Sequence, residues 1–178
     1  MSALTKLLAP ELLAARVLDR LQPLFALALR WYVAWQFLKS GWLKVTSWDT
    51  TLWLFENEYR TPLLPPLGAA VLGVFGELFF PALLILGLAS RLGALGLSAV
   101  NAMAVVSYAH VLLTAGNEAA LGQHVLWGLM LATIAIYGPG KLSFDHWIAR
   151  PRALMGSAAR AAAQERKQGR WSIPPRVE

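Results

Sequence analysis

Residues 67–89 decide the fold: they read LGAAVLGVFGELFFPALLILGLA and contain a single charged residue, Glu77. Residues 92–114 and 119–140 are similarly long and apolar, and neither stretch contains Lys, Arg, Asp or Glu. A helix needs about 20 residues to cross the roughly 30 Å hydrocarbon core of a bilayer. Buried helices of soluble proteins seldom run that long without a polar face. The three stretches therefore predict membrane-spanning helices.

A fourth stretch, residues 24–43, has the length of a span but contains Arg30 and Lys39. Over the whole chain 57% of residues are hydrophobic and 15% are charged, whereas soluble domains average roughly 45–50% and about 25%. This composition excludes an ordinary soluble globule and a disordered chain. The lack of cysteine in the sequence excludes disulfides and thiolate metal sites. We predict an all-α protein, an integral membrane four-helix bundle with spans at about 24–43, 67–89, 92–114 and 119–138.

The net charge of +6 is distributed as in a transmembrane protein. If the N-terminus is cytoplasmic, twelve of the 16 Lys and Arg residues fall on that side, whereas Lys44 and Arg60 fall on the other. Cytoplasmic segments of membrane proteins carry this excess of basic residues. We predict a multi-pass protein of the bacterial inner membrane with both termini in the cytoplasm. Topology accounts for the basic charge, so we expect no nucleic acid as a partner.

Two segments flank the predicted four-span domain, which covers residues 23–148. Residues 1–22 combine apolar residues at helical spacing with charged residues between them. This pattern predicts an amphipathic helix that lies on the inner membrane surface. Residues 149–178 are rich in alanine and arginine. They predict a basic cytoplasmic tail that is attracted to anionic lipid.

The loop between the first two spans is predicted to contain a short helix. Trp48, Leu52, Phe55 and Tyr59 recur at helical spacing, and Ser47 precedes them as a candidate N-cap. Aromatic side chains are enriched where a membrane protein meets the lipid headgroups. We therefore predict that this helix lies in the outer membrane interface.

Glu77 lies near the middle of the second predicted span. An ionisable side chain is costly at that depth, so the carboxyl group is expected to be either protonated or paired with a base. One interpretation is a site for a ligand or a proton, and the other is an ion pair that locks the bundle. Arg30 in the first span is the partner that we predict, at a depth that differs by about 9 Å on the helical rise.

Four further polar residues lie in or near the last two spans. Asn101 is expected to hydrogen-bond to another helix. His110, His124 and Glu118 are expected at similar depth near the outer membrane surface. We predict that they make hydrogen bonds at the interface, and the alternative is that they handle protons or a metal ion. The histidines lack the HxH and HxxxH spacings, so no metal site is assigned. The sequence also contains no phosphate-binding loop, dinucleotide-binding loop or nucleophile elbow.

Several short strings, taken in order, resemble one protein family. They are LRWY at 29–32, FLKSGWLK at 37–44, LFENEY at 54–59, PLLPP at 62–66, GEL at 76–78, GLASRL at 87–92 and GPGKLSFD at 138–145. Over about residues 24–148 they are similar to the DoxX family of small bacterial inner-membrane proteins with four helices. The family pattern has an arginine in the first span, a glutamate in the second and a Gly-Pro-Gly turn after the fourth. Arg30, Glu77 and residues 138–140 match this pattern.

The resemblance implies a relation to the membrane subunit of a thiosulfate:quinone oxidoreductase and to gene clusters for oxidative and metal stress. We expect an auxiliary membrane subunit, not catalytic on its own, that supports redox or stress-related chemistry and binds a small lipophilic ligand such as quinone. The residues expected to form its polar core and line its cavity are Arg30, Glu77, Asn101, Trp31, Trp35 and Trp127.

Two alternatives stay open from the sequence. One is a quinone-linked oxidoreductase that acts on a reduced sulfur substrate, with His110 and His124 handling protons. The other is a metal-stress accessory membrane protein that uses these histidines and Glu118. For each of these functions the expected partners are the lipid bilayer, a membrane or peripheral redox protein, and a second copy of the chain in a homodimer.

Overall fold

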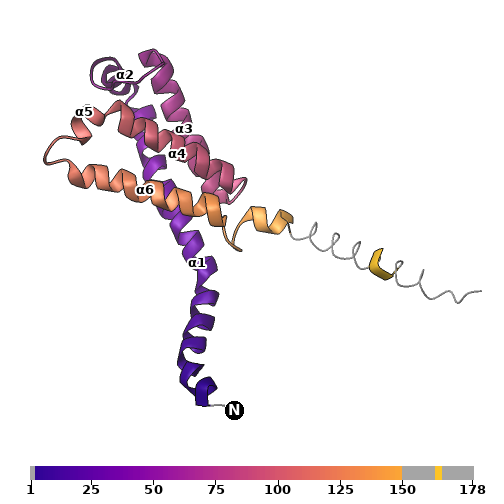
Figure 1. Cartoon of the computed structure of the whole chain (residues 1–178). Helices are drawn as coiled ribbons and strands as arrows, with labels where there is room; N and C mark the ends of the chain where they lie inside the picture. The colour runs from indigo at the N-terminus through magenta and orange to yellow at the C-terminus, as the bar shows by residue number, and fades with distance from the viewer. Residues whose placement is uncertain (1–2, 150–162, 166–178) are drawn as a thin grey trace, which may run out of the picture.

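The computed structural model describes residues 3–149 and 163–165 of the chain. Over these residues the protein is helical, with no strand (Figure 1). The helices with both ends described are α1 (Ala3–Thr46), α2 (Trp48–Asn57), α3 (Pro66–Leu86), α4 (Ser90–Ser107), α5 (Ala109–Leu112) and α6 (Glu118–Tyr137). A further helical stretch begins at residue 144. Most of the predicted tail, residues 150–162 and 166–178, lies outside the described part.

Three helices are long and apolar enough to cross a membrane, namely α3, α4 and α6. They coincide with three of the four predicted spans, so the chain is a membrane protein with an all-helical fold. The predicted first span falls within α1, whose residues 24–43 include Arg30, Gln36 and Lys39. These side chains make it less apolar than the other three, and its place as a fourth span stays a prediction.

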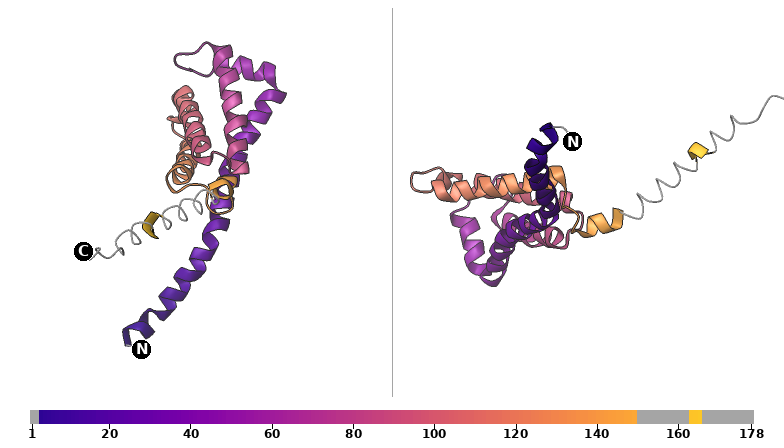
Figure 2. Two further views of the ribbon diagram at one scale, coloured as in Figure 1. Left: turned by 90° about the vertical axis from the view of Figure 1, so that its right-hand side faces the viewer. Right: turned by 90° about the horizontal axis from the view of Figure 1, so that it is seen from below.

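Helix α1 is continuous from Ala3 to Thr46, so the predicted division near residue 22 does not coincide with a helix end. Its N-terminal part extends away from the other helices (Figures 1 and 2). The sequence offers no glycine C-cap near that division, and Pro23 removes only one backbone donor from the helix. The expected N-terminal helix and the expected first span are therefore parts of one element.

The short helix predicted in the first loop is α2 (Trp48–Asn57), although it ends earlier than the aromatic spacing indicates. Ser47 occupies the N-cap position, but its side chain makes no capping hydrogen bond. Tyr59 lies beyond the helix and packs edge-on against Phe55, with 4.9 Å between the ring centroids. The next backbone N–H, of Arg60, donates to the carbonyl of Ser107 at 2.9 Å. This bond ties the α2–α3 loop to the end of α4.

The core lies where α1, α3, α4 and α6 meet. Its fully or nearly fully buried apolar residues are Val33, Ala34 and Phe37 of α1, Leu84 of α3, Ala94 and Leu97 of α4, and Leu131 and Ile134 of α6. Helix α6 is the least enclosed of the three candidate spans, with only 11% of its most apolar window buried inside the protein. Most of its surface is therefore available to lipid.

Candidate functional site

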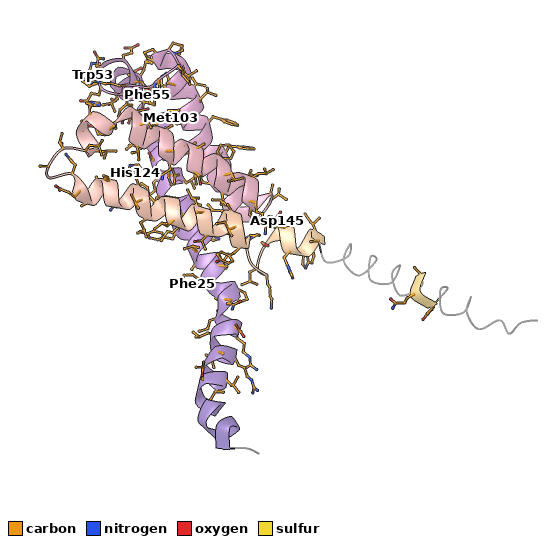
Figure 3. The ribbon with its side chains drawn as sticks, viewed as in Figure 1. Phe25, Trp53, Phe55, Met103, His124 and Asp145 are labelled. Atoms are coloured by element: carbon orange, nitrogen blue, oxygen red, sulfur yellow. The ribbon has the colours of Figure 1, made fainter. Side chains whose placement is uncertain are left out.

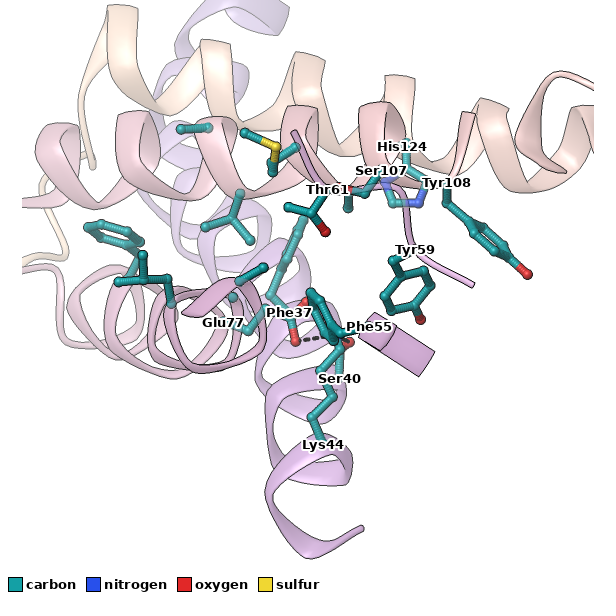
Figure 4. A pocket seen from close by; sticks show the side chains of 18 of the residues that line it. Phe37, Ser40, Lys44, Phe55, Tyr59, Thr61, Glu77, Ser107, Tyr108 and His124 are labelled. Atoms are coloured by element: carbon teal, nitrogen blue, oxygen red, sulfur yellow. Dashed lines mark hydrogen bonds and ion pairs between the residues drawn. The ribbon is translucent and has the colours of Figure 1, made fainter. Parts of the chain in front are cut away.

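A cavity of about 540 Å³ lies between the helices at the end of the molecule where α2 and the α2–α3 loop are located (Figure 4). Its wall is mostly apolar and includes the aromatic residues Phe37, Phe55, Phe80 and Trp127. The polar residues that line it are Gln36, Ser40, Lys44, Tyr59, Thr61, Glu77, Ser107, Tyr108 and His124. Helices α1, α2, α3, α4, α5 and α6 all contribute to the wall.

An ion pair between Lys44 of α1 and Glu77 of α3 lies in the cavity wall. The Lys44 ammonium donates to both carboxylate oxygens of Glu77 at 2.6 Å and to the Ser40 hydroxyl at 2.9 Å. Glu77 is almost fully buried, whereas the Lys44 side chain is 19% exposed. The pair satisfies the requirement that a carboxylate inside a membrane protein be neutralised.

Glycine and proline residues shape the backbone around this pair. A side chain at Gly41 of α1 would come within 2.9 Å of the Glu77 β-carbon, so glycine permits the close approach of α1 to α3. Pro81 lies inside α3, one turn after Glu77, and has no N–H to donate to the Glu77 carbonyl. The ion pair thus lies where α1 is close to α3 and where α3 lacks one backbone hydrogen bond.

The predicted partner of Glu77 was wrong, because Lys44 and not Arg30 makes the ion pair. Both basic residues lie on the same side of α1, as expected, but Arg30 meets α3 two turns further along, at Leu84. Helical periodicity fixes which side chains share a face. It does not fix which level of the neighbouring helix they meet, and that register decided the pairing.

Arg30 instead closes the opposite end of the bundle. It is fully buried, and its guanidinium donates to the carbonyl oxygen of Leu84 at 2.9 Å and to that of Leu142. Asp145 (Figure 3) accepts from the backbone N–H groups of Ala89 at 2.7 Å and Ser90 at 2.8 Å, at the start of α4. The Asp145 N–H donates to the carbonyl of Gly87 at 2.8 Å.

We call the set Arg30, Leu84, Gly87, Leu142 and Asp145 the closed end. Its contacts hold the chain after α6 against the turn between α3 and α4. Gly87 adopts a left-handed conformation with φ of 70°, and a side chain there would collide with the Arg30 guanidinium and Ser143. None of these five residues lines the cavity. Arg30 is therefore placed at a structural junction rather than in the candidate site.

Asn101 and His124 form a pair that joins α4 to α6. The Asn101 side-chain amide donates to the backbone carbonyl of His124 at 2.9 Å. Its oxygen lies 2.8 Å from Nδ1 of the His124 ring. The interhelical hydrogen bond predicted for Asn101 is present. His124 lines the cavity, whereas Asn101 does not line it and contacts His124.

Of the three tryptophans predicted at the cavity, the structure places Trp127 there. Its ring packs edge-on against Phe37 at 5.4 Å and against His124 at 5.0 Å between centroids. Trp31 and Trp35 are each 50% exposed and do not line the cavity. The buried side of α1 passes through Val33, Ala34 and Phe37, so these two rings lie on its other side.

The residues considered for metal handling do not form a cluster. His110 lies in α5 and is exposed, with its ring against Tyr108. Glu118 is also exposed, and its carboxylate accepts from the N–H of Gly116 at 3.0 and 3.1 Å. Within residues 3–149 and 163–165 no three His, Asp or Glu side chains are grouped to hold a metal ion.

Two polar residues of the α2–α3 loop lie at the cavity and were not predicted there. The hydroxyl oxygen of Thr61 is buried and has no hydrogen-bond partner within the described chain. Burial raises the pKa of Tyr59, and the nearby Tyr108, Glu77 and Glu58 raise it further. The phenol is therefore neutral at ordinary pH and can donate a hydrogen bond. Thr61 carries no periodic signal, and the helical spacing that includes Tyr59 does not show what this side chain faces, so only the fold shows their position at the cavity.

Comparison with known proteins supports one family. A sequence model of the DoxX family matches residues 25–111, from within α1 to α5. An uncharacterized protein of Haemophilus influenzae is 31% identical to this chain over 126 residues, which cover 67% of this chain and 80% of that protein. No solved structure matches the chain. The family model and a relative that matches over most of its own length agree, and the chain therefore belongs to the DoxX family of membrane proteins.

Proposed function

We propose that this protein is an auxiliary membrane subunit that holds a small lipophilic ligand of the quinone class for redox chemistry performed by a partner. The observation that carries the proposal is the cavity of about 540 Å³, in which a few polar groups interrupt an apolar wall. Sites for small molecules are typically about 300–1,000 Å³, mostly apolar, with a few polar groups that fix orientation.

The apolar wall suits a planar ring with an aliphatic tail. Phe37, Phe55, Phe80 and Trp127 come from four different helices. Aromatic side chains in such an arrangement can pack against the face or the edge of a ligand ring. A ligand of this kind would reach the cavity from the lipid, where its concentration is highest.

The polar groups suit a ligand that carries oxygen atoms on its ring. The Lys44 ammonium makes three contacts, to the two Glu77 oxygens and to Ser40, so its donors are engaged. The buried Thr61 hydroxyl has no partner among the described residues, and an unpaired buried hydroxyl is unfavourable. Thr61 lines the cavity, and a ligand carbonyl oxygen would accept from this hydroxyl once the side chain turns it to the cavity surface.

The finer topology also belongs to this proposal. We place residues 24–43 of α1 as the fourth span, both termini in the cytoplasm and the chain in the bacterial inner membrane. Helix α1 is continuous through Pro23 in this structure, so residues 1–22 reach the inner surface only when the helix bends at Pro23, and α2 then lies at the outer surface. The distribution of basic residues supports this orientation.

The sequence contains no cysteine, so single cysteines can be introduced to test the orientation. We expect a membrane-impermeant thiol reagent added to intact cells to label Thr50→Cys in α2. It should label Gln22→Cys only after the cells are opened. Labelling of residue 22 in intact cells would overturn the proposed orientation.

Binding can be tested with protein in lipid nanodiscs and decylubiquinone as the probe. We expect saturable quenching of tryptophan fluorescence. The quenching should decrease in Trp127→Phe, whose ring lines the cavity, but not in Trp31→Phe, whose ring is exposed. Thr61→Val should weaken binding about three- to tenfold, the worth of one hydrogen bond. Quenching that does not saturate, or that is equal in both tryptophan variants, would overturn the cavity as the quinone site.

The same preparation distinguishes an auxiliary subunit from an enzyme. Addition of thiosulfate to the quinone-loaded protein should leave the quinone oxidised if a partner performs the chemistry. Reduction of the quinone by this chain alone would favour the oxidoreductase alternative. A homodimer and a redox partner protein stay predictions, and native mass spectrometry of the nanodisc sample would reveal either.

A further inference from the structure

The pair formed by Asn101 and His124 determines where the histidine ring carries its proton. The backbone carbonyl of His124 can only accept, so the Asn101 nitrogen at 2.9 Å from it must be the amide NH₂ group. The other end of the Asn101 side chain, which faces Nδ1 of His124 at 2.8 Å, is therefore its oxygen. Since that oxygen can only accept, Nδ1 carries the hydrogen.

A neutral imidazole with its hydrogen on Nδ1 has a free lone pair on Nε2. No hydrogen bond to Nε2 occurs within the described part of the chain. The buried side-chain polar atoms without a partner there are Arg30 Nε, Thr61 Oγ1 and Ser90 Oγ. Nε2 is not one of them, so this edge of the ring is accessible.

The His124 ring belongs to the cavity wall, among the side chains drawn in Figure 4. Trp127, one turn further along α6, packs edge-on against it at 5.0 Å between centroids and restrains its orientation. The acidic group in the same cavity, Glu77, is neutralised by Lys44. No free carboxylate in the cavity wall therefore stabilises a cationic imidazole, and the ring is neutral. Its Nε2 is a hydrogen-bond acceptor held in position at a mostly apolar cavity.

We propose that His124 accepts a hydrogen bond from a hydroxyl group on the ring of the bound ligand, and that Asn101 positions it for this role. The inference rests on the proposed function, because it concerns the same cavity. It adds a preference: a phenol or hydroquinone is bound more tightly than the same ring without an O–H donor. His124 is the residue that determines this preference, and Asn101 is a positioning residue.

The preference can be measured with two redox-inert probes, 4-octylphenol and its methyl ether 4-octylanisole, added to the full chain in nanodiscs. The phenol should bind about three- to tenfold more tightly than the ether, as expected for one hydrogen bond. In His124→Phe, which keeps a ring, the two affinities should become equal. Met103→Leu, at another position in the cavity wall, should leave the ratio unchanged.

The tautomer is tested separately by ¹⁵N NMR of the histidine rings, assigned with His124→Phe. We expect the His124 proton on Nδ1 in the wild type. In Asn101→Leu the proton should no longer favour Nδ1, and the phenol should no longer bind more tightly than the ether. A proton found on Nε2, or a phenol preference that survives in His124→Phe, would overturn this inference and leave the cavity proposal standing. If neither probe nor decylubiquinone binds, both proposals fail.

Discussion

The two ends of the bundle each hold a basic residue of α1 against α3, but the two residues are used differently. Arg30 at the closed end is fully buried and donates to backbone carbonyls of two separate segments. Lys44 at the other end pairs with a carboxylate and borders a cavity of about 540 Å³. The planar guanidinium offers several donors in fixed directions, whereas the ammonium is a compact charge. The comparison indicates that Arg30 holds the fold together and that Lys44 and Glu77 shape a site.

The largest effect is expected from Arg30→Leu. It removes two charge-assisted hydrogen bonds, to the carbonyls of Leu84 and Leu142, at a cost of about 3–6 kcal/mol. Unfolding by denaturant in mild detergent, or the yield of folded protein, measures this cost. Lys39→Leu, an exposed position on the same helix, serves as the control and should change little. Equal stability of the two variants would contradict the role assigned to the closed end.

A smaller loss is expected from Gly87→Ala. The left-handed φ of 70° costs about 1–2 kcal/mol for a residue with a side chain, and the added methyl group would also displace Arg30 and Ser143. The matched control is Gly122→Ala in α6, where an added methyl group meets no atom within 4 Å. That substitution should be neutral or stabilising by up to about 1 kcal/mol, because alanine favours a helix. The same unfolding assay compares the two variants. The free energy of unfolding should fall in Gly87→Ala and stay the same or rise in Gly122→Ala.

The smallest effect on stability is expected from the double variant Lys44→Met, Glu77→Leu. Replacement of both partners of a buried ion pair by apolar residues is often neutral, whereas removal of one partner leaves an unpaired charge. Glu77→Leu alone should therefore be less stable than the double variant. The affinity for decylubiquinone should fall in the single variant and in the double variant. A double variant that folds and binds like the wild type would show that the ion pair does not shape the site.

The apolar spans were predictable because their length and composition depend only on local sequence. Glu77 could likewise be identified as a polar core residue, since it is the one charged residue in 67–89. Its partner could not, because the register between α1 and α3 is set by tertiary packing at Gly41 and at the closed end. Trp31 and Trp35 were misplaced for a related reason. Their residue type suits both a cavity and a lipid-facing surface, and only the packing of α1 decides between the two.

The walls of the cavity differ from one another in how they are held in place. Helices α1 and α3 are joined by the ion pair and the closed end, whereas α6 brings His124 and Trp127 to the site with only 11% of its most apolar window buried. Within the bundle, α6 is held by packing, by the Asn101–His124 pair and by a hydrogen bond from Arg91 to the Ile136 carbonyl at 3.3 Å, and lipid surrounds the rest of it. The thickness and lateral pressure of the bilayer therefore act directly on one wall of the ligand cavity. A detergent that preserves the helices can still alter what the cavity binds.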